Sequence, residues 1–131
     1  MKAFQDNAID VFPLAFVTSF FSTGGLPSLN LANVSLFLSQ GSDYDYLLKT
    51  CNPTDNTTFP GTSLPNCAAL AYDIQYCQSK GKIITISLGG ATGSVGFSSD
   101  AEAQQFAQNI WNIFLGGTSS TRPFGSAILD G

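Results

Sequence analysis

The sequence contains no histidine, and this absence excludes several kinds of catalytic and metal site at once. A Ser/His/Asp triad and a Cys/His dyad both need an imidazole as general base, and most zinc sites use imidazole as a ligand. Glutamate is nearly absent as well, because Glu102 is the only one in the chain. A hydrolase with two catalytic carboxylates would therefore draw mainly on aspartates. We expect neither a metal nor another cofactor.

Charged residues are also scarce, and most of those present are acidic. They make up 11% of the chain, with five lysines and arginines against nine aspartates and glutamates. This excess of negative charge argues against binding to nucleic acid and to anionic membrane surfaces. No apolar run reaches the roughly 18 residues that a membrane helix needs, so we expect no membrane partner. Apolar residues nevertheless make up 44% of the chain, which is too many for a disordered tail.

The cysteine count and the composition indicate an extracellular protein. A chain of 131 residues is at most one domain, and its three cysteines cannot all pair within it. N-glycosylation acceptors begin at Asn33 and Asn56, and with the abundant Ser, Thr, Asn and Gly they suggest an extracellular protein. No signal peptide is visible, because the apolar residues 11–21 follow acidic ones and include Pro13. We therefore expect the natural N-terminus to lie upstream of Met1.

Three strands are predicted from the hydrophobic pattern. Residues 9–16 are mostly apolar, which is typical of a parallel strand buried on both faces, although Pro13 cannot donate to a central ladder. Residues 82–88 are β-branched and largely apolar, and a further short strand begins at residues 126–129. Residues 29–65 are irregular and rich in Asn, Ser, Thr and Pro, which predicts a long loop.

Two amphipathic helices are predicted between the strands. The first begins at an Asn66 N-cap and ends at Gly81, whereas the second begins at Ser99, with Glu102 in a capping box, and ends at residues 116–117. Their predicted buried residues are Leu70, Ile74 and Cys77, and Phe106, Ile110, Ile113 and Phe114. This alternation demands a parallel sheet with right-handed crossovers. Three strands and two helices are too few to cover such a sheet.

A glycine-rich loop, residues 89–98, lies between a strand and a helix, where nucleotide-binding loops are found. Its spacing fits neither the G-x-G-x-x-G pattern nor a P-loop, so nucleotide binding is disfavoured. A tight strand-to-helix turn is one interpretation. A better one is ligand binding, because Gly89 and Gly90 at the carboxyl end of a strand leave the backbone bare for a flat ligand.

The carboxylates differ in what they can do. Glu102 is expected to bond the N-cap amide, and Asp73 is expected to face solvent. Asp43 and Asp45 lie two residues apart in an irregular loop, where nothing supports a catalytic pair. Asp130 follows an apolar run, which places it at the carboxyl end of a strand, the edge that carries catalysis in a (β/α)₈ barrel. A helix cap or loop contact is an equally good interpretation of Asp130.

Four stretches of sequence carry a family resemblance. Residues 86–90 (Ile-Ser-Leu-Gly-Gly) resemble the S-x-G-G signature in strand three of glycoside hydrolase family 18. Residues 111–117 and 122–131 resemble the run into strand four of its plant- and fungal-type class III chitinases, and residues 10–16 resemble strand two. Asp130 matches the first aspartate of the family motif D-x-x-D-x-D-x-E, and the motif's glutamate would lie beyond the last residue.

The resemblance implies an α/β fold in which residues 1–131 are a partial family 18 catalytic domain. They would form about strands two to four of a (β/α)₈ TIM barrel with their helices, truncated at both ends. The implied reaction is hydrolysis of β-1,4-linked N-acetylglucosamine in chitin by a substrate-assisted, retaining mechanism. In it, the motif glutamate protonates the glycosidic oxygen, and the acetamide carbonyl of the sugar attacks the anomeric carbon. Without that glutamate we expect the chain to be inactive alone. Three strands of an eight-stranded barrel would leave sheet edges unpaired and core faces bare, so we also expect it to be prone to aggregate.

The resemblance also implies roles for single residues. Phe16, Asn30, Gly89 and Gly90 would bind the N-acetylglucosamine oligomer, and Asp130 would support the catalytic motif electrostatically.

The resemblance further suggests how the cysteines pair. Cys51 and Cys67 would form a local disulfide, and Cys77 would stay unpaired because Phe4 stands where relatives carry its partner. Residues 34–50 would be an insertion, since their removal joins Asn33 to Cys51 in a family-like sequence. We hypothesise that this segment is a retained intron translated in frame.

Two other functions stay open at this point. The same barrel occurs with a disabled glutamate as a non-catalytic chitin or carbohydrate binder. The chain could also be a truncated gene product without function.

Overall fold

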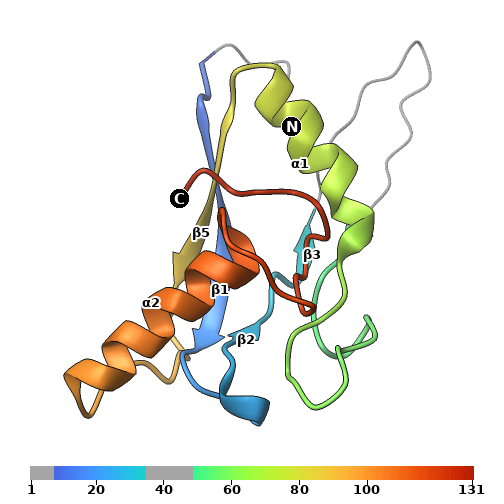
Figure 1. Cartoon of the computed structure of the whole chain (residues 1–131). Coiled ribbons are helices and arrows are strands. Elements are labelled where there is room, and N and C mark those ends of the chain that lie inside the picture. Colours follow the sequence, from blue (N-terminus) through green and yellow to red (C-terminus); the bar gives the residue numbers. More distant parts are fainter. Residues whose placement is uncertain (1–7, 35–48) are drawn as a thin grey trace.

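The structure is a computed structural model that describes residues 8–34 and 49–131. Its elements follow the order β1 (Val11–Ser19), η1 (Thr23–Gly25), β2 (Ser28–Leu29), β3 (Asn33–Val34), β4 (Lys49–Thr50), η2 (Ala68–Leu70), α1 (Ala71–Ser79), β5 (Ile83–Leu88) and α2 (Asp100–Phe114). Figure 1 shows β1 and β5 side by side at the centre, with the C-terminal segment passing next to β5.

The centre of the fold is the parallel pair of β1 and β5. Their register runs from Val11 opposite Ile83 to Val17 opposite Leu88, with one irregularity between Ala15 and Val17. The short β2 pairs antiparallel with the other side of β1, which gives the strand order β2-β1-β5. β3 and β4 form a separate two-stranded sheet. The predicted parallel pairing of the first two apolar segments is confirmed.

Pro13 is accommodated inside β1, opposite Thr85. The carbonyl of Asp10 accepts the N–H of Ile83 at 2.8 Å, so alternate residues of β1 turn their backbone polar groups toward β5 and Pro13 turns its nitrogen away. Within the described residues, backbone pairing on that other side begins only at Phe16. The missing proline N–H therefore leaves the ladder with β5 intact.

One face of the strand pair is buried and the other is half exposed. Leu14 and Ile84 are 6% and 1% exposed and belong to the same core as the buried residues of both helices. Val11 and Ile83, on the opposite face, are 48% and 44% exposed. The prediction of burial on both faces is therefore wrong for the described part of the chain, because both helices contribute to the core on a single side.

The first helix begins later than predicted. A 3₁₀ turn, η2, precedes α1, and the side chain of Asn66 accepts the N–H of Ala68 at 3.2 Å. Asn66 thus bonds the first residue of the turn from one position before its N-cap, Cys67, and the helix proper starts at Ala71. Asp73 is 1% exposed, so the prediction that it faces solvent is wrong. It lies four residues before Cys77 and hence on the same helix face, one turn away.

The second helix follows its predicted cap closely. The Ser99 side chain accepts the N–H of Glu102 at 3.2 Å, and the Glu102 carboxylate accepts the N–H of Ser98 at 2.6 Å. The glutamate therefore bonds the residue before the N-cap, one position from the expected amide. All the predicted stripe residues of both helices are buried, namely Leu70, Ile74, Cys77, Phe106, Ile110, Ile113 and Phe114.

The carboxyl end of α2 is held by Arg122, which the sequence did not single out. Its guanidinium donates to five backbone carbonyl oxygens, those of Asn112, Leu115, Gly117, Gly125 and Ala127. Burial lowers the pKa of this group from its ordinary value. A cation at this position also complements the partial negative charge of the helix end.

The predicted strand at residues 126–129 does not form. The N–H of Leu129 bonds to the carbonyl of Phe114 at the end of α2, at 3.0 Å, so this segment is occupied by the helix end. Pairing with β5 comes only afterwards, where the N–H of Asp130 meets the carbonyl of Ile84 and the N–H of Ile86 meets the carbonyl of Gly131, each at 2.8 Å.

Candidate functional site

The structure brings four sequence-predicted residues together where β1 and β5 end. We call Phe16, Asn30, Gly89 and Gly90 the carboxyl edge. Phe16 and Asn30 exchange two backbone hydrogen bonds of 3.0 and 3.1 Å, and the N–H of Gly89 bonds to the carbonyl of Val17 at 2.8 Å. Three segments that are distant in the sequence therefore meet at one edge of the sheet.

The ring of Phe16 lies against the bare backbone of Gly90. A Cβ built on Gly90 would lie 3.1 Å from the ring, and Gly90 has a φ of +94°, which disfavours any side chain. The Phe16 side chain is 42% exposed, and the peptide bond before it is cis. The result is a half-open aromatic face next to the exposed Gly90. Gly89 is buried, so the prediction of backbone left bare for a ligand does not hold at Gly89.

Asn30 contributes differently from the other three residues. It is exposed, and its side-chain oxygen accepts the N–H of Ala32 at 2.8 Å. This bond stabilises a turn in which Ala32 adopts a φ of +51°. Asn30 thereby fixes the direction in which the chain leaves the carboxyl edge.

A disulfide supports the segment behind Asn30. Cys51 and Cys67 are bonded, as the family resemblance implied. The backbone of Cys51 also bonds to this segment, accepting from Leu31 at 2.8 Å and donating to Ala32 at 3.3 Å. The disulfide therefore links the carboxyl edge to η2, which begins directly after Cys67.

Comparison with known proteins finds chitinases among the relatives of this chain. Chitinase 1 of Rhizopus niveus is 44% identical over 127 residues, which cover 97% of this chain and 22% of that protein. A class III chitinase of Arthroderma benhamiae is 39% identical over 128 residues, covering 94% of this chain and 33% of that protein. The chain is homologous to class III chitinases. It spans between 22% and 33% of the length of these two relatives. No family model matches the chain.

Solved structures agree with the sequence relatives. The ICChI chitinase from Ipomoea carnea is similar with a TM-score of 0.66 and 38% identity, over 93% of this chain and 35% of that one. The xylanase and α-amylase inhibitor protein XAIP-II from Scadoxus multiflorus has a TM-score of 0.61 and 25% identity, over 99% of this chain and 37% of that one. The fold is α/β and similar to that of chitinases. The partial (β/α)₈ barrel stays a prediction.

Asp130 is not at the edge where the strand pattern placed it. Its backbone N–H bonds to the carbonyl of Ile84, and its carboxylate accepts the N–H of the same residue at 2.8 Å. Ile84 is the second residue of β5, whereas Gly89 directly follows the last. Five residues of extended chain span roughly 16 Å, so Asp130 lies far from the carboxyl edge. The strand predicted at residues 126–129 is absent, and Asp130 is the first residue of this segment to pair with β5.

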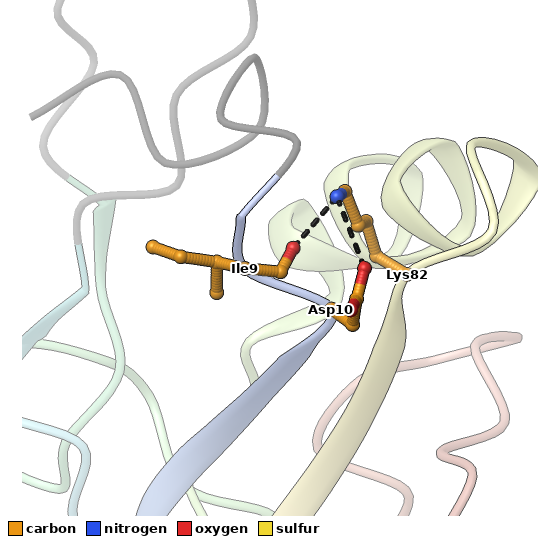
Figure 2. Close-up of polar contacts among 3 residues, drawn as sticks. All are labelled: Ile9, Asp10 and Lys82. Atoms are coloured by element: carbon orange, nitrogen blue, oxygen red, sulfur yellow. Dashed lines mark hydrogen bonds and ion pairs between the residues drawn. The ribbon is translucent and has the colours of Figure 1, made fainter.

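Asp130 belongs to what we call the amino edge, together with Ile9, Asp10, Lys82 and Ile84. Lys82 donates to the carbonyl of Ile9 at 2.6 Å and its Nζ lies 3.8 Å from the carboxylate of Asp10 (Figure 2). The Asp130 carboxylate also accepts from the Gln78 side chain at 3.0 Å. Hydrogen bonds and charge thus tie both strands at this edge. A catalytic role for Asp130 stays a prediction.

The other carboxylates are distributed away from the carboxyl edge. Glu102 is in the α2 cap, where the N–H of Ser98 lowers the pKa of its carboxyl group. Asp73 is buried in the core beside Cys77. Asp43 and Asp45 lie outside the described residues. Within the described part of the chain, no group of three or more potential ligands could hold a metal ion.

Cys77 is a free, buried thiol, in agreement with its predicted lack of a partner. Burial raises its pKa from 9.0 to about 12, and the nearby carboxylate of Asp73 acts in the same direction. A thiol with so high a pKa is protonated at neutral pH and is a poor nucleophile. Cys77 is therefore a core residue.

Two further predictions concern the irregular segment. Asn56 accepts the N–H of Asn52 at 3.1 Å and donates to the carbonyl of Asn66 at 3.5 Å, so its amide is engaged within the disulfide loop. Glycosylation at Asn56 or Asn33 stays a prediction. The insertion at residues 34–50 also stays a prediction, because residues 35–48 lie outside the described residues. Its two ends are adjacent, since β3 and β4 pair with each other.

Proposed function

We propose that the carboxyl edge is part of the site at which a chitinase-like glycoside hydrolase binds β-1,4-linked N-acetylglucosamine. The observation that carries this proposal is the half-exposed ring of Phe16 against the bare backbone of Gly90. A sugar ring has an apolar face that packs on an aromatic ring, and the exposed Gly90, which has no side chain, lets the sugar approach the main chain closely. The homology to chitinases selects this ligand among the flat, polar molecules that such a surface could bind.

For the whole protein we propose the substrate-assisted, retaining hydrolysis of chitin. That reaction needs one carboxylic acid near the sugar. In this chain the only glutamate, Glu102, is in the cap of α2, and Asp130 is at the amino edge. We therefore expect residues 1–131 to bind N-acetylglucosamine oligomers without hydrolysing them. We also propose an extracellular location. Among the described residues, no helix has the length and apolar character needed to span a membrane.

The test is calorimetric titration of the purified chain with the N-acetylglucosamine tetramer, followed by chromatography of the sugar. We expect binding, unchanged tetramer, and clearly weaker binding by Phe16→Ala. Tyr72→Ala is the matched control, because Tyr72 is an exposed aromatic residue, 53% accessible, on α1. Equal affinity of Phe16→Ala and the unaltered chain would contradict the proposal. Hydrolysis of the tetramer would contradict the expectation that neither Glu102 nor Asp130 acts as the catalytic acid.

A second function is favoured by the likeness to XAIP-II, which is named an inhibitor of xylanase and α-amylase. On that alternative the fold is a non-catalytic binding module. Xylanase and α-amylase assays with added chain separate the two functions, since a sugar-binding site alone predicts no inhibition of either enzyme.

A further inference from the structure

Trp111 is the only tryptophan of the chain, and it lies near the end of α2 with 51% of its surface exposed. It begins the run Trp-Asn-Ile-Phe-Leu-Gly-Gly, which carried part of the family resemblance and which takes no part in the carboxyl edge. A single exposed apolar side chain is ordinary on a protein surface. This one is unusual because the backbone that follows it holds the ring in place.

Two glycines let the indole of Trp111 lie against the main chain. A Cβ built on Gly116 would lie 2.8 Å from the six-membered ring, and one built on Gly117 would lie 2.7 Å from the five-membered ring. The carbonyl of Trp111 accepts the N–H groups of Leu115 and Gly117 at 3.2 and 3.0 Å, which brings this backbone next to the indole. The ring is therefore positioned before a ligand arrives, and binding to it costs little side-chain entropy.

The surface around Trp111 is polar and uncharged. Gln108 and Gln104 lie about one and two turns before Trp111 on the same side of α2, and both are exposed. The loop after the two glycines, residues 118–121, reads Thr-Ser-Ser-Thr. We call Gln104, Gln108, Trp111 and residues 116–121 the Trp111 surface. Its amide and hydroxyl groups both donate and accept hydrogen bonds.

Charge separates this surface from the rest of the chain. No charged residue occurs in the sequence between Glu102 and Arg122. The guanidinium of Arg122 donates to the carbonyls of Asn112, Leu115 and Gly117, so its donors are engaged by the backbone of the same loop. The Trp111 surface therefore matches an uncharged ligand that has an apolar face and many hydroxyl or amide groups, which is the chemistry of a neutral sugar.

The Trp111 surface lies away from the carboxyl edge. α2 begins at Asp100, just after the glycine-rich loop, and rises about 1.5 Å per residue, so Trp111 lies roughly 16 Å farther along the helix. The last residue of α2, Phe114, bonds to Leu129 of the C-terminal segment, which passes next to the helix end (Figure 1). A sugar at Trp111 is therefore a different contact from a sugar at Phe16.

We propose that the Trp111 surface is a second, separate carbohydrate-binding site, which holds the β-1,4-linked N-acetylglucosamine polymer on the outside of α2. The kind of sugar rests on the proposed function of the carboxyl edge. The apolar face of a sugar ring packs on the indole, and its hydroxyl and acetamide groups exchange hydrogen bonds with Gln108 and the hydroxyls of residues 118–121. An insoluble polymer offers many strands, so contact at two places strengthens binding because the second contact is intramolecular.

The emission of the single tryptophan reports on this site directly. The full chain is titrated with the N-acetylglucosamine hexamer, and we expect a blue shift of the emission and protection from quenching by acrylamide, because the sugar displaces water from the exposed indole. Phe16→Ala should keep this response while calorimetry shows its loss of binding at the carboxyl edge.

Retention on colloidal chitin tests the same site by mutation. We expect Trp111→Ala to weaken retention roughly three- to tenfold. Gly116→Ala keeps the ring but places a methyl group 2.8 Å from it, so it should displace the indole and weaken retention less. Ile128→Ala is the matched control, because Ile128 is an apolar residue of the C-terminal segment that is 53% exposed. It should leave retention unchanged.

The outcomes separate the two proposed sites. An emission spectrum that stays unchanged at saturating hexamer overturns the Trp111 site while the carboxyl-edge site stands. A response that disappears in Phe16→Ala also overturns it, because the indole would then sense a ligand bound elsewhere. A response that persists while Phe16→Ala binds the hexamer as the unaltered chain does supports the Trp111 site and overturns the carboxyl-edge site. Circular dichroism of each variant verifies that it is folded.

Discussion

The two edges of the β1–β5 pair are built from different chemistry. At the amino edge, Lys82 and Asp130 use their charged groups on backbone atoms of the neighbouring segments. At the carboxyl edge, Phe16 is half exposed and packs against Gly90, which is itself exposed and carries no side chain. The polar side chains of the amino edge are hydrogen-bonded within the chain, whereas the carboxyl edge exposes an apolar surface.

This difference indicates a division between stability and binding. In parallel α/β proteins ligands bind at the carboxyl ends of the strands, whereas the opposite edge serves stability. The presence of a carboxylate therefore does not by itself indicate catalysis, because its role depends on the edge of the sheet at which it lies. Asp130 takes the place of a backbone acceptor for Ile84, and this use depends on which end of the strand it reaches.

The largest expected effect tests the amino edge. Asp130→Ala removes the acceptor for the N–H of Ile84 and for the side chain of Gln78, and we expect it to lower the free energy of unfolding by about 2 kcal/mol. Asp130→Asn keeps a side-chain acceptor and should lose clearly less. Urea denaturation gives the stability and tetramer titration gives the affinity. Reduced affinity in folded Asp130→Ala would break the division between the edges.

The next effect tests the carboxyl edge. Gly90→Ala forces a side chain into a φ of +94° and against the Phe16 ring, so we expect a loss of about 1–2 kcal/mol together with weaker sugar binding. Gly25→Ala is the control for strain alone, because Gly25 has a φ of +71° and nothing within 4 Å of the added Cβ. It should cost about 1 kcal/mol and leave binding unchanged. Equal affinities of the two variants would argue that the Phe16–Gly90 contact is not part of the site.

Local patterns in the sequence were sufficient for the helices and the central strands. The capping box of Ser99 and the buried stripe of α2 depend on residues within a few turns. The stripe formed as predicted, and the capping box formed with Glu102 bonded to the N–H of Ser98 in place of that of Ser99. The site residues depended on the family resemblance, which related Phe16 to Gly90 across more than seventy positions. Such a contact leaves no trace in local periodicity.

The predictions that failed depended on tertiary contacts. The strand at residues 126–129 is absent because Leu129 bonds to Phe114 at the end of α2. The hydrophobic pattern of residues 126–129 does not reveal this contact. Asp130 was therefore predicted at the end of a strand, whereas it is the first residue of the C-terminal segment that pairs with β5. The stacking of Phe20 on Phe97 was missed because the long irregular segment, α1 and β5 separate the two residues in the sequence.

The smallest effect concerns the helix that leads into the amino edge. The carbonyl of Cys77 accepts the N–H groups of Lys80 and Lys82, and its side chain is buried in the core. The pKa of this thiol is about 12 in the folded chain against 9.0 when exposed, so the unfolded chain releases the thiol proton first. The contribution of Cys77 to stability is therefore complete below pH 9 and decreases as the pH rises toward 12.

We expect the unaltered chain to lose about 1 kcal/mol more than Cys77→Ala between about pH 8 and pH 10. The comparison of the two chains cancels the titration of lysines and tyrosines, which both contain. Urea denaturation at each pH measures the difference, and alkylation of Cys77 in the folded chain should stay slow over the same range. Parallel pH profiles would mean that the thiol becomes hydrated in the folded state. The helix end would then be looser than its hydrogen bonds to the amino edge imply.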